Sequence, residues 1–164
     1  MTLFLTKRET PLGKVVAYRN ERGLVSMGFS DGMKDEPAAL VDPDPAIGEA
    51  IDRYFAGSSG AFDALAVDVQ GTALQRRIWH RLRDIPPGET RSYRELGAEV
   101  GTSGRVVGNA MAANPLCLAL PCHRVIRSDG AWHGYAYGND RKRWLLEHEA
   151  KVRTPSGPAD PLGE

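Results

Sequence analysis

The sequence predicts two parts: an α/β N-terminal domain over residues 1–70, a small antiparallel sheet with a helix, and a mainly helical C-terminal domain over residues 71–150. Strand-like runs are confined to the first part and helical periodicity dominates the second. Charge reverses at the same place, with 11 acidic and 7 basic side chains before residue 71 and 10 acidic and 14 basic after it. This reversal indicates that the C-terminal part faces a negatively charged partner. An arginine-rich, solvated helix face explains the same count, so both interpretations stay open.

The N-terminal elements follow from local patterns. Two β-branched-rich runs flank the turn sequence Asn20-Glu21-Arg22-Gly23, which predicts a hairpin. Gly, Asp and Pro are frequent between residues 30 and 44, which predicts a loop. The expected elements are strands over residues 14–18 and 24–29, a third strand at residues 3–5, and a helix over residues 45–55.

The C-terminal part shows amphipathic spacing bounded by capping residues and glycines. Two short helices separated by a glycine-containing turn give the outline of a helix-turn-helix. The tail is rich in Pro, Gly and Asp, so residues 151–164 are expected to be disordered. The expected elements are helices that begin at Thr72, Tyr93, Ser103 and Asp140, and a strand over residues 116–120.

Several classes of protein are excluded. No run is apolar for long enough to span a bilayer, and the N-terminus lacks the features of a secretory signal, so a cytoplasmic location is expected. Cys117 and Cys122 are too few for a structural zinc site and too close in sequence to cross-link much of the chain. If either cysteine carries chemistry, it acts as a free thiol.

Cys122 and His123 are the candidate reactive pair. A thiol is nucleophilic only as the thiolate, and a neighbouring imidazole can accept its proton. Neighbouring side chains often point apart, however, and a base also needs a partner on its second nitrogen, for which Glu149 is the candidate. From spacing alone, Cys122 as a small core side chain and His123 as a loop residue remain the alternative.

A set of motifs resembles the O6-alkylguanine-DNA alkyltransferases, also called methylated-DNA–protein-cysteine methyltransferases. The resemblance covers residues 71–150. Its members, in family order, are Gly71–Trp79, Ile85-Pro86-Pro87-Gly88-Glu89-Thr90, Ser92-Tyr93, Arg105-Val106-Val107-Gly108, Asn114-Pro115, Pro121-Cys122-His123-Arg124-Val125-Ile126, Gly134-Tyr135 and Lys142–Glu149.

The resemblance implies catalytic roles for five residues. Cys122 would accept the alkyl group irreversibly and once per molecule, with no cofactor and no metal. His123 would act as its base, in the family through a bridging water, with Glu149 holding the other imidazole nitrogen. Tyr93 would protonate or polarise the guanine leaving group, and Asn114 would tie the helix-turn-helix to the active-site segment.

The resemblance also implies a monomer that binds double-stranded DNA containing O6-alkylguanine from the minor groove. Arg105 would fill the stack after the damaged base has flipped out. A winged helix-turn-helix-like element would carry the DNA contacts: Arg105, Tyr93, Ser103, Gly108 and Ala110. The base pocket would be lined by Val125, Tyr135, Ala136 and Trp132. Ala136 stands where the family often has a serine, and Tyr137 is bulkier than its usual counterpart, which leaves the range of alkyl groups open.

Three other functions are weighed against repair by transfer. Alkyltransferase-like proteins bind the same lesion without transfer, but they carry tryptophan in place of the cysteine. A helix-turn-helix transcription factor leaves Cys122, His123 and Glu149 without a role. A cysteine hydrolase leaves Tyr93 and Arg105 without one.

Overall fold

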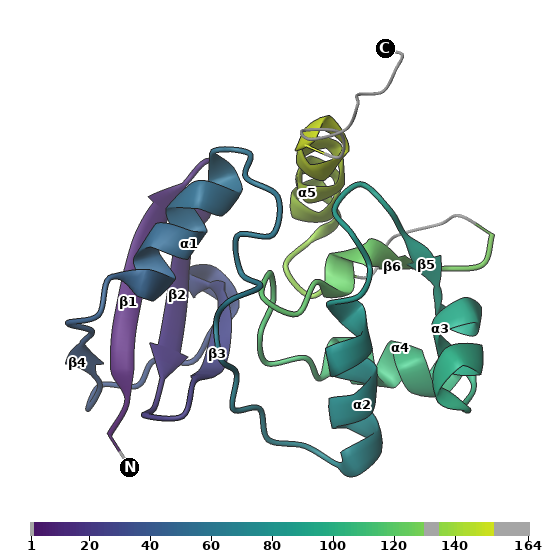
Figure 1. The fold of residues 1–164 in the computed structure, drawn as a ribbon, viewed down its shortest axis with the longest axis horizontal. Helices are drawn as coiled ribbons and strands as arrows, with labels where there is room; N and C mark the ends of the chain where they lie inside the picture. Colours follow the sequence, from purple (N-terminus) through teal and green to yellow (C-terminus); the bar gives the residue numbers. More distant parts are fainter. Residues whose placement is uncertain (1, 130–134, 153–164) are drawn as a thin grey trace.

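The computed structural model describes residues 2–129 and 135–152 (Figure 1). A four-stranded sheet with one helix precedes a group of helices, and the buried apolar side chains of both parts form one cluster. The predicted pocket residue Trp132, and the predicted tail from residue 153 onward, lie outside the described residues. Lys151 and Val152, predicted to belong to the tail, instead continue the last helix.

The N-terminal sheet is mixed, which corrects the prediction of an antiparallel sheet. Strands β1 (Phe4–Thr10), β2 (Gly13–Arg19) and β3 (Leu24–Phe29) pair in antiparallel fashion, and β4 (Leu40–Val41) pairs parallel to β1. The segment predicted to be a loop carries β4. Arg19 on β2 holds this segment with two hydrogen bonds of 2.6 Å to the carboxylate of Asp42, a two-pronged geometry that fixes orientation.

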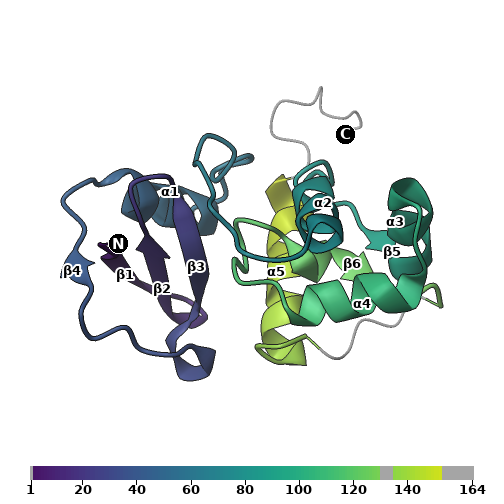
Figure 2. The ribbon, with the colours of Figure 1, turned by 90° about the horizontal axis from the view of Figure 1, so that it is seen from below.

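Helix α1 (Ala46–Phe55) covers one face of this sheet and lies along β1 (Figure 1). Its buried face consists of Ile47, Ala50, Ile51 and Tyr54. Seen from below, β3 is the strand that lies towards the helical part (Figure 2). The backbone of Met27 on β3 bonds to Pro115 and Cys117, at 2.9 and 3.0 Å. The sheet edge is therefore joined directly to the segment that leads to Cys122.

The helical part begins with α2 (Ala73–Leu82), whose first turn is closed by a reciprocal capping box between Thr72 and Gln75. Helices α3 (Tyr93–Val100) and α4 (Gly104–Ala112) follow, and α5 (Asn139–Val152) ends the described chain. Gly101 ends α3 in the left-handed region, with φ of 78°, which glycine adopts without steric cost. The helices predicted from spacing and capping are thus present, with α5 longer than expected.

The expectation of a strand over residues 116–120 was wrong. Only Leu116 pairs with the sheet, and the chain then turns, with Leu118 at φ of 78° and a hydrogen bond of 2.8 Å from Leu120 N to the Leu116 carbonyl. The side chain of Asn114 spans this turn, donating to the Leu120 carbonyl and accepting from Leu116 N. We call residues 114–122 the cysteine turn.

A short parallel pair that the sequence did not reveal brings the two ends of the site together. Strand β5 (Arg91–Ser92) pairs with β6 (Val125–Ile126). Because α3 starts directly after β5, and the 3-10 turn η2 (Cys122–Arg124) ends directly before β6, this pairing places Tyr93 near Cys122.

In the described part of the chain no helix is long and apolar enough to cross a membrane.

Candidate active site

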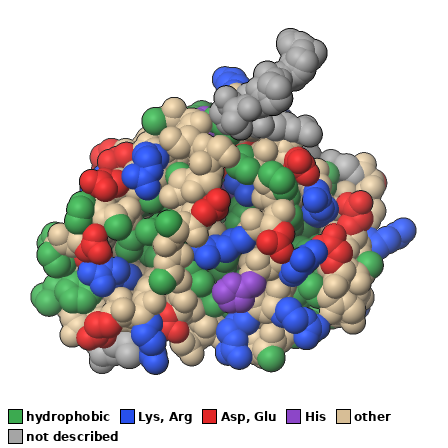
Figure 3. All heavy atoms as spheres, viewed as in Figure 1, with side chains coloured by type: hydrophobic (Ala, Val, Ile, Leu, Met, Phe, Trp, Pro, Cys, Tyr) green, Lys and Arg blue, Asp and Glu red, His purple; other side chains and the backbone are tan. Residues whose placement is uncertain are grey.

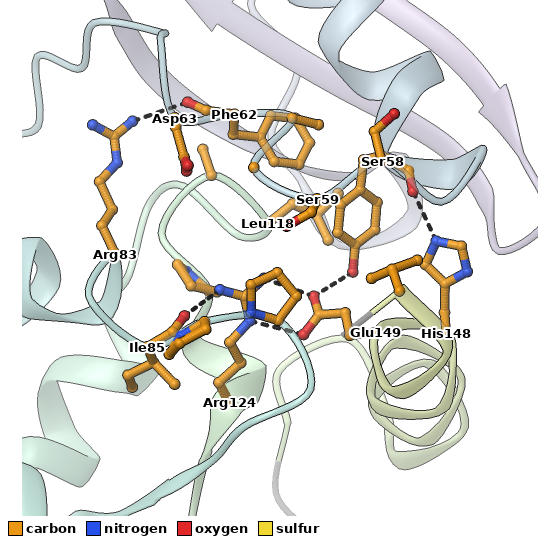
Figure 4. Close-up of a pocket in the computed structure, with 18 of the residues that line it drawn as sticks. Ser58, Ser59, Phe62, Asp63, Arg83, Ile85, Leu118, Arg124, His148 and Glu149 are labelled. Atoms are coloured by element: carbon orange, nitrogen blue, oxygen red, sulfur yellow. Dashed lines mark hydrogen bonds and ion pairs between the residues drawn. The ribbon is translucent and has the colours of Figure 1, made fainter. Parts of the chain in front are cut away.

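Cys122 lies at the start of η2 and is only 6% exposed. It lines a small cavity of about 60 Å³, together with Tyr93, Gly108, Met111, Ala112, Tyr135, Ala136 and Lys142. The structure therefore brings residues from α3, α4, α5 and the loop before α5 to one thiol. A larger pocket of about 300 Å³ is lined by Glu149 and Arg124 among others (Figure 4). Cys122 does not line this pocket, so we place the chemistry at the smaller cavity.

Glu149 on α5 is the centre of a buried hydrogen-bond network. Its carboxylate accepts from His123 Nε2 at 2.6 Å and from the Tyr54 hydroxyl at 2.6 Å. Arg124 adds two bonds, from Nε at 2.8 Å and from Nη2 at 3.0 Å (Figure 4). These donors occupy the lone pairs that one carboxylate offers. Glu149 is thereby fixed in position, and it orients the imidazole of His123.

Charge keeps Glu149 ionised despite its burial. Burial alone raises the pKa of this carboxyl, but electrostatic attraction and hydrogen bonds to His123 and Arg124 outweigh it and hold the pKa well below its ordinary value of 4.5. A carboxylate that accepts from Nε2 fixes the proton of a neutral imidazole on that nitrogen. Nδ1 is then the basic nitrogen, and it is buried without a hydrogen-bond partner among the described residues.

The surroundings of Cys122 favour its thiolate. Contact with Cys117 lowers the pKa of the Cys122 thiol; burial opposes this, and the Asn114 amide and Lys142 charge lower it further. Lys142 is buried, and its Nζ donates to the Val125 carbonyl at 3.0 Å. The net direction is a more acidic thiol than usual, which raises the fraction of nucleophile at neutral pH.

The other predicted catalytic and pocket residues differ in how deeply they are buried. Tyr93 is half-buried at the start of α3, and Asn114 spans the cysteine turn. Tyr135 lines the Cys122 cavity, and its buried hydroxyl has no hydrogen-bond partner within the described chain. Val125 is fully buried and its carbonyl already accepts from Lys142. Ala136 is exposed at the rim of the cavity.

Helix α4 presents only some of the residues that were predicted to meet DNA. Arg105 and Ser103 are exposed, and Ser103 caps α4 by accepting from Val106 N at 3.2 Å. Ala110 does not belong to this surface: it is 2% exposed, and its carbonyl accepts from Trp79 Nε1 at 2.8 Å. The helical period turns Ala110 towards α2, so this part of the prediction was wrong.

Sequence reasoning missed Tyr54, Arg124, Lys142 and the placement of Cys117. Arg124 and Lys142 lie inside the quoted motifs, yet a charged residue gives no sequence signal that it will be buried. Tyr54 is 95 positions from Glu149, and its spacing on α1 indicates only a core-facing side chain. Cys117 falls within the strand predicted over residues 116–120, and the turn that replaces this strand brings it to Cys122.

Comparisons with known proteins show the family of the chain. Residues 73–151 match the family described as 6-O-methylguanine DNA methyltransferase, DNA binding domain. The chain is 39% identical over 148 residues to a methylated-DNA–protein-cysteine methyltransferase of Methanosarcina barkeri, covering 86% of this chain and 93% of that one. It is 47% identical over 154 residues to the protein of that name from Mycobacterium bovis, covering 90% and 92%.

Solved structures show the same architecture. The O6-methylguanine methyltransferase of Mycobacterium tuberculosis superposes with a TM-score of 0.80 at 34% identity, over 98% of both chains. A Mycobacterium tuberculosis OGT in complex with DNA superposes with a TM-score of 0.82 at 31% identity, over 93% of this chain and 94% of that one. A buried thiol followed in the sequence by an imidazole that a carboxylate orients fits a protein whose nucleophile is a cysteine. The chain belongs to the methylated-DNA–protein-cysteine methyltransferase family.

Proposed function

We propose that this protein repairs DNA by direct reversal, taking the alkyl group of O6-alkylguanine onto Cys122 in a single irreversible turnover. The observation that carries this assignment is the buried Cys122 thiol at a small cavity, followed in the sequence by His123, whose imidazole Glu149 holds at 2.6 Å. The sulfur of Cys122 attacks the carbon attached to guanine O6, the carbon–oxygen bond breaks, and a thioether forms. Because the carbon–sulfur bond of a thioether does not break again to release the thiol, the protein is consumed.

The proton of the Cys122 thiol passes towards His123. With Nε2–H directed to Glu149, Nδ1 is the nitrogen that accepts it. The imidazolium that results is stabilised by the ionised carboxylate of Glu149 at 2.6 Å. Burial and the nearby Cys122 raise the pKa of the Tyr93 phenol, so Tyr93 holds its proton at neutral pH and is available as a hydrogen-bond donor to the leaving guanine.

Helices α3 and α4 form the DNA-binding element that we propose, a helix-turn-helix whose β5–β6 pair takes the place of a wing. Arg105, Ser103 and Gly108 lie on the accessible side of α4. A small residue such as Gly108 permits close approach to a narrow groove, and an exposed arginine suits the gap left by a flipped base. We propose the minor groove for this contact, since its degenerate pattern suits repair in any sequence.

The site is complete within one chain, which supports action as a monomer. Binding of the lesion without transfer is the second candidate. It would need the accepting thiol to be absent or inert, whereas Cys122 is present and its pKa is lowered.

The test is incubation of the protein with a duplex that contains one O6-methylguanine, followed by peptide mass spectrometry. We expect one methyl group on the Cys122 peptide, in proportion to the protein and without turnover, and none in Cys122→Ser. Tight binding of the duplex with an unmodified peptide would support lesion binding instead. Release of more than one repaired guanine per protein would exclude the single-use mechanism.

A further inference from the structure

The two cysteines of the chain lie in contact. The Sγ atoms of Cys117 and Cys122 are 3.9 Å apart, and both residues are buried, at 3% and 6% exposure. The proposed repair reaction consumes only one of these thiols. The transfer reaction gives no role in bond formation to the second thiol, Cys117, although it lies against the nucleophile.

The cysteine turn brings the two residues together. Leu118 adopts φ of 78°, the only non-glycine residue in the described ranges with positive φ, and so folds the chain back on itself. Asn114 holds the turn through the Leu120 carbonyl and Leu116 N, at 2.8 and 2.9 Å. The backbone N–H of Cys117 donates to the Met27 carbonyl at 3.0 Å.

The two thiols differ in reactivity. Their contact lowers the pKa of Cys122, whereas the same contact, together with burial, raises the pKa of Cys117 well above its ordinary value. Cys122 is therefore the sulfur that a peroxide oxidises first, and it also lines the cavity next to Tyr93 and Ala136. Cys117 keeps its proton and remains a thiol within reach.

We propose that Cys117 is a resolving thiol, which captures oxidised Cys122 in a reversible disulfide. The Cys122 thiolate attacks one oxygen of hydrogen peroxide; a sulfur–oxygen bond forms, the oxygen–oxygen bond breaks, and hydroxide leaves. Oxidation removes the Cys122 charge that helps to raise the pKa of Cys117. Cys117 then gives its proton to the departing hydroxyl and attacks the sulfur of this sulfenic acid as a thiolate; a sulfur–sulfur bond forms and water leaves. The two thiols lose two electrons in total, and the peroxide is reduced to two waters.

The geometry permits this second step with little movement. A disulfide has a sulfur–sulfur distance near 2.05 Å, so the two sulfurs must approach by about 1.9 Å. The consequence rests on the proposed function: oxidised protein loses transfer activity but is spared the irreversible oxidation of its acceptor. A thiol reductant then returns it to use.

The experiment uses the full chain, reduced and then exposed to hydrogen peroxide at neutral pH. Free thiols are blocked with iodoacetamide under denaturing conditions before digestion with trypsin. Both cysteines fall in one peptide, because no Lys or Arg lies between Arg105 and Arg124. We expect this peptide unblocked and two hydrogens lighter than its reduced form, and we expect dithiothreitol to restore both blockable thiols and the transfer activity.

Two variants separate a resolving role from a packing role. In Cys117→Ala and Cys117→Ser, the same peroxide treatment should add two or three oxygen atoms to Cys122, and dithiothreitol should not restore activity. Each variant is scored against its own activity before oxidation, which removes any effect on folding. Wild-type protein that gains oxygen on Cys122 while Cys117 remains blockable would overturn the proposal, as would equal recovery of wild type and both variants.

The outcome is independent of the repair assignment. If the disulfide forms but no methyl group ever reaches Cys122 from the damaged duplex, the proposed function fails and the resolving thiol stands. A non-reducing gel shows whether the link is within one chain, as the 3.9 Å contact requires, since a link between chains would appear as a dimer and would contradict the proposal.

Discussion

At the scale of single residues, Glu149 determines both the chemistry and part of the stability. Four donor groups converge on its carboxylate: two from Arg124, one from His123 and one from Tyr54. Its 1% exposure means that water does not replace any donor that is lost. A single substitution here should therefore affect the imidazole, the arginine and the fold together.

We expect Glu149→Gln to slow alkyl transfer on the order of 100-fold, the usual contribution of an oriented base, and to cost about 3 kcal/mol of stability, because Arg124 loses its buried counter-charge. The folded pKa of Glu149 lies below its unfolded value, so its stabilisation is present above pH 4.5 and is lost as pH falls below that value. The stability gap between wild type and variant should therefore narrow on acidification. Transfer kinetics and urea unfolding from pH 7 to pH 3 measure both effects.

Glu147 supplies the matched control, because it lies on the same helix but is exposed. Glu147→Gln should leave the rate and the pH dependence of unfolding unchanged. A constant gap between wild type and Glu149→Gln down to pH 3 would mean that the carboxylate is not held ionised by its partners.

At the scale of elements, the turn between α3 and α4 depends on a glycine inside α3. A Cβ at Gly97 would lie 2.7 Å from the Thr102 carbonyl oxygen and 2.9 Å from the backbone of Ser103. Backbone atoms cannot move aside as a flexible side chain does. By contrast, a Cβ at Gly108 in the middle of α4 meets nothing within 4 Å. Gly97 therefore permits α3 to pack against the turn that leads into α4, and Gly108 leaves open space beside the middle of α4.

Gly97→Ala should destabilise the protein by about 1–3 kcal/mol through overpacking, and should weaken duplex binding because α4 is displaced. Gly108→Ala should raise stability by about 0.5–1 kcal/mol, since alanine is the better helix former, yet it should also weaken duplex binding. Thermal unfolding and fluorescence titration with a DNA duplex distinguish the two. Unchanged binding in Gly108→Ala would show that this face of α4 does not approach DNA.

The elements also show how far sequence reasoning reaches. Helices α2, α3 and α4 were predicted from amphipathic spacing and from the residues that bound them, which are local features, and the structure shows a hydroxyl side chain that caps each of them. Residues 116–120 were misread because apolar composition suits a buried turn as well as a strand. The turn exists because Asn114 bonds to both of its ends and Met27 anchors it from β3, and such distant contacts leave no periodic trace.

The site divides in the same way. Cys122, His123 and Glu149 were named through the resemblance to a family, not through spacing. Arg124 and Tyr54 were given no role in the site, because the burial of a polar group is decided by its tertiary partners. The parallel β5–β6 pair that positions Tyr93 involves two residues on each side, which is too short for any pattern to predict.

At the scale of the whole molecule, the two parts are joined through the site itself. Tyr54 reaches Glu149 from α1, the edge of β3 holds Cys117, and Arg141 on α5 forms an ion pair of 2.9 Å with Asp31. Away from the site, charges of both signs are interspersed over the face in Figure 3, and hydrophobic side chains gather at the edge formed by β4, where Val41 is 84% exposed. The N-terminal part thus acts on the active site through a few specific contacts.

The Tyr54 hydroxyl provides the sharpest test of this coupling. Tyr54→Phe should cost about 1.5–3 kcal/mol, as expected for a hydrogen bond to a charged group, whereas in a Glu149→Gln background the same change should cost much less. The matched control is Tyr18→Phe: Tyr18 is equally buried, but its hydroxyl accepts from Glu36 N at 3.2 Å and touches no part of the site. Its cost should add to that of Glu149→Gln within about 0.5 kcal/mol. Urea unfolding of the wild type, the three single variants and the two double variants measures both cycles. Additive costs for Tyr54→Phe and Glu149→Gln would mean that the 2.6 Å contact carries no coupling between the two parts.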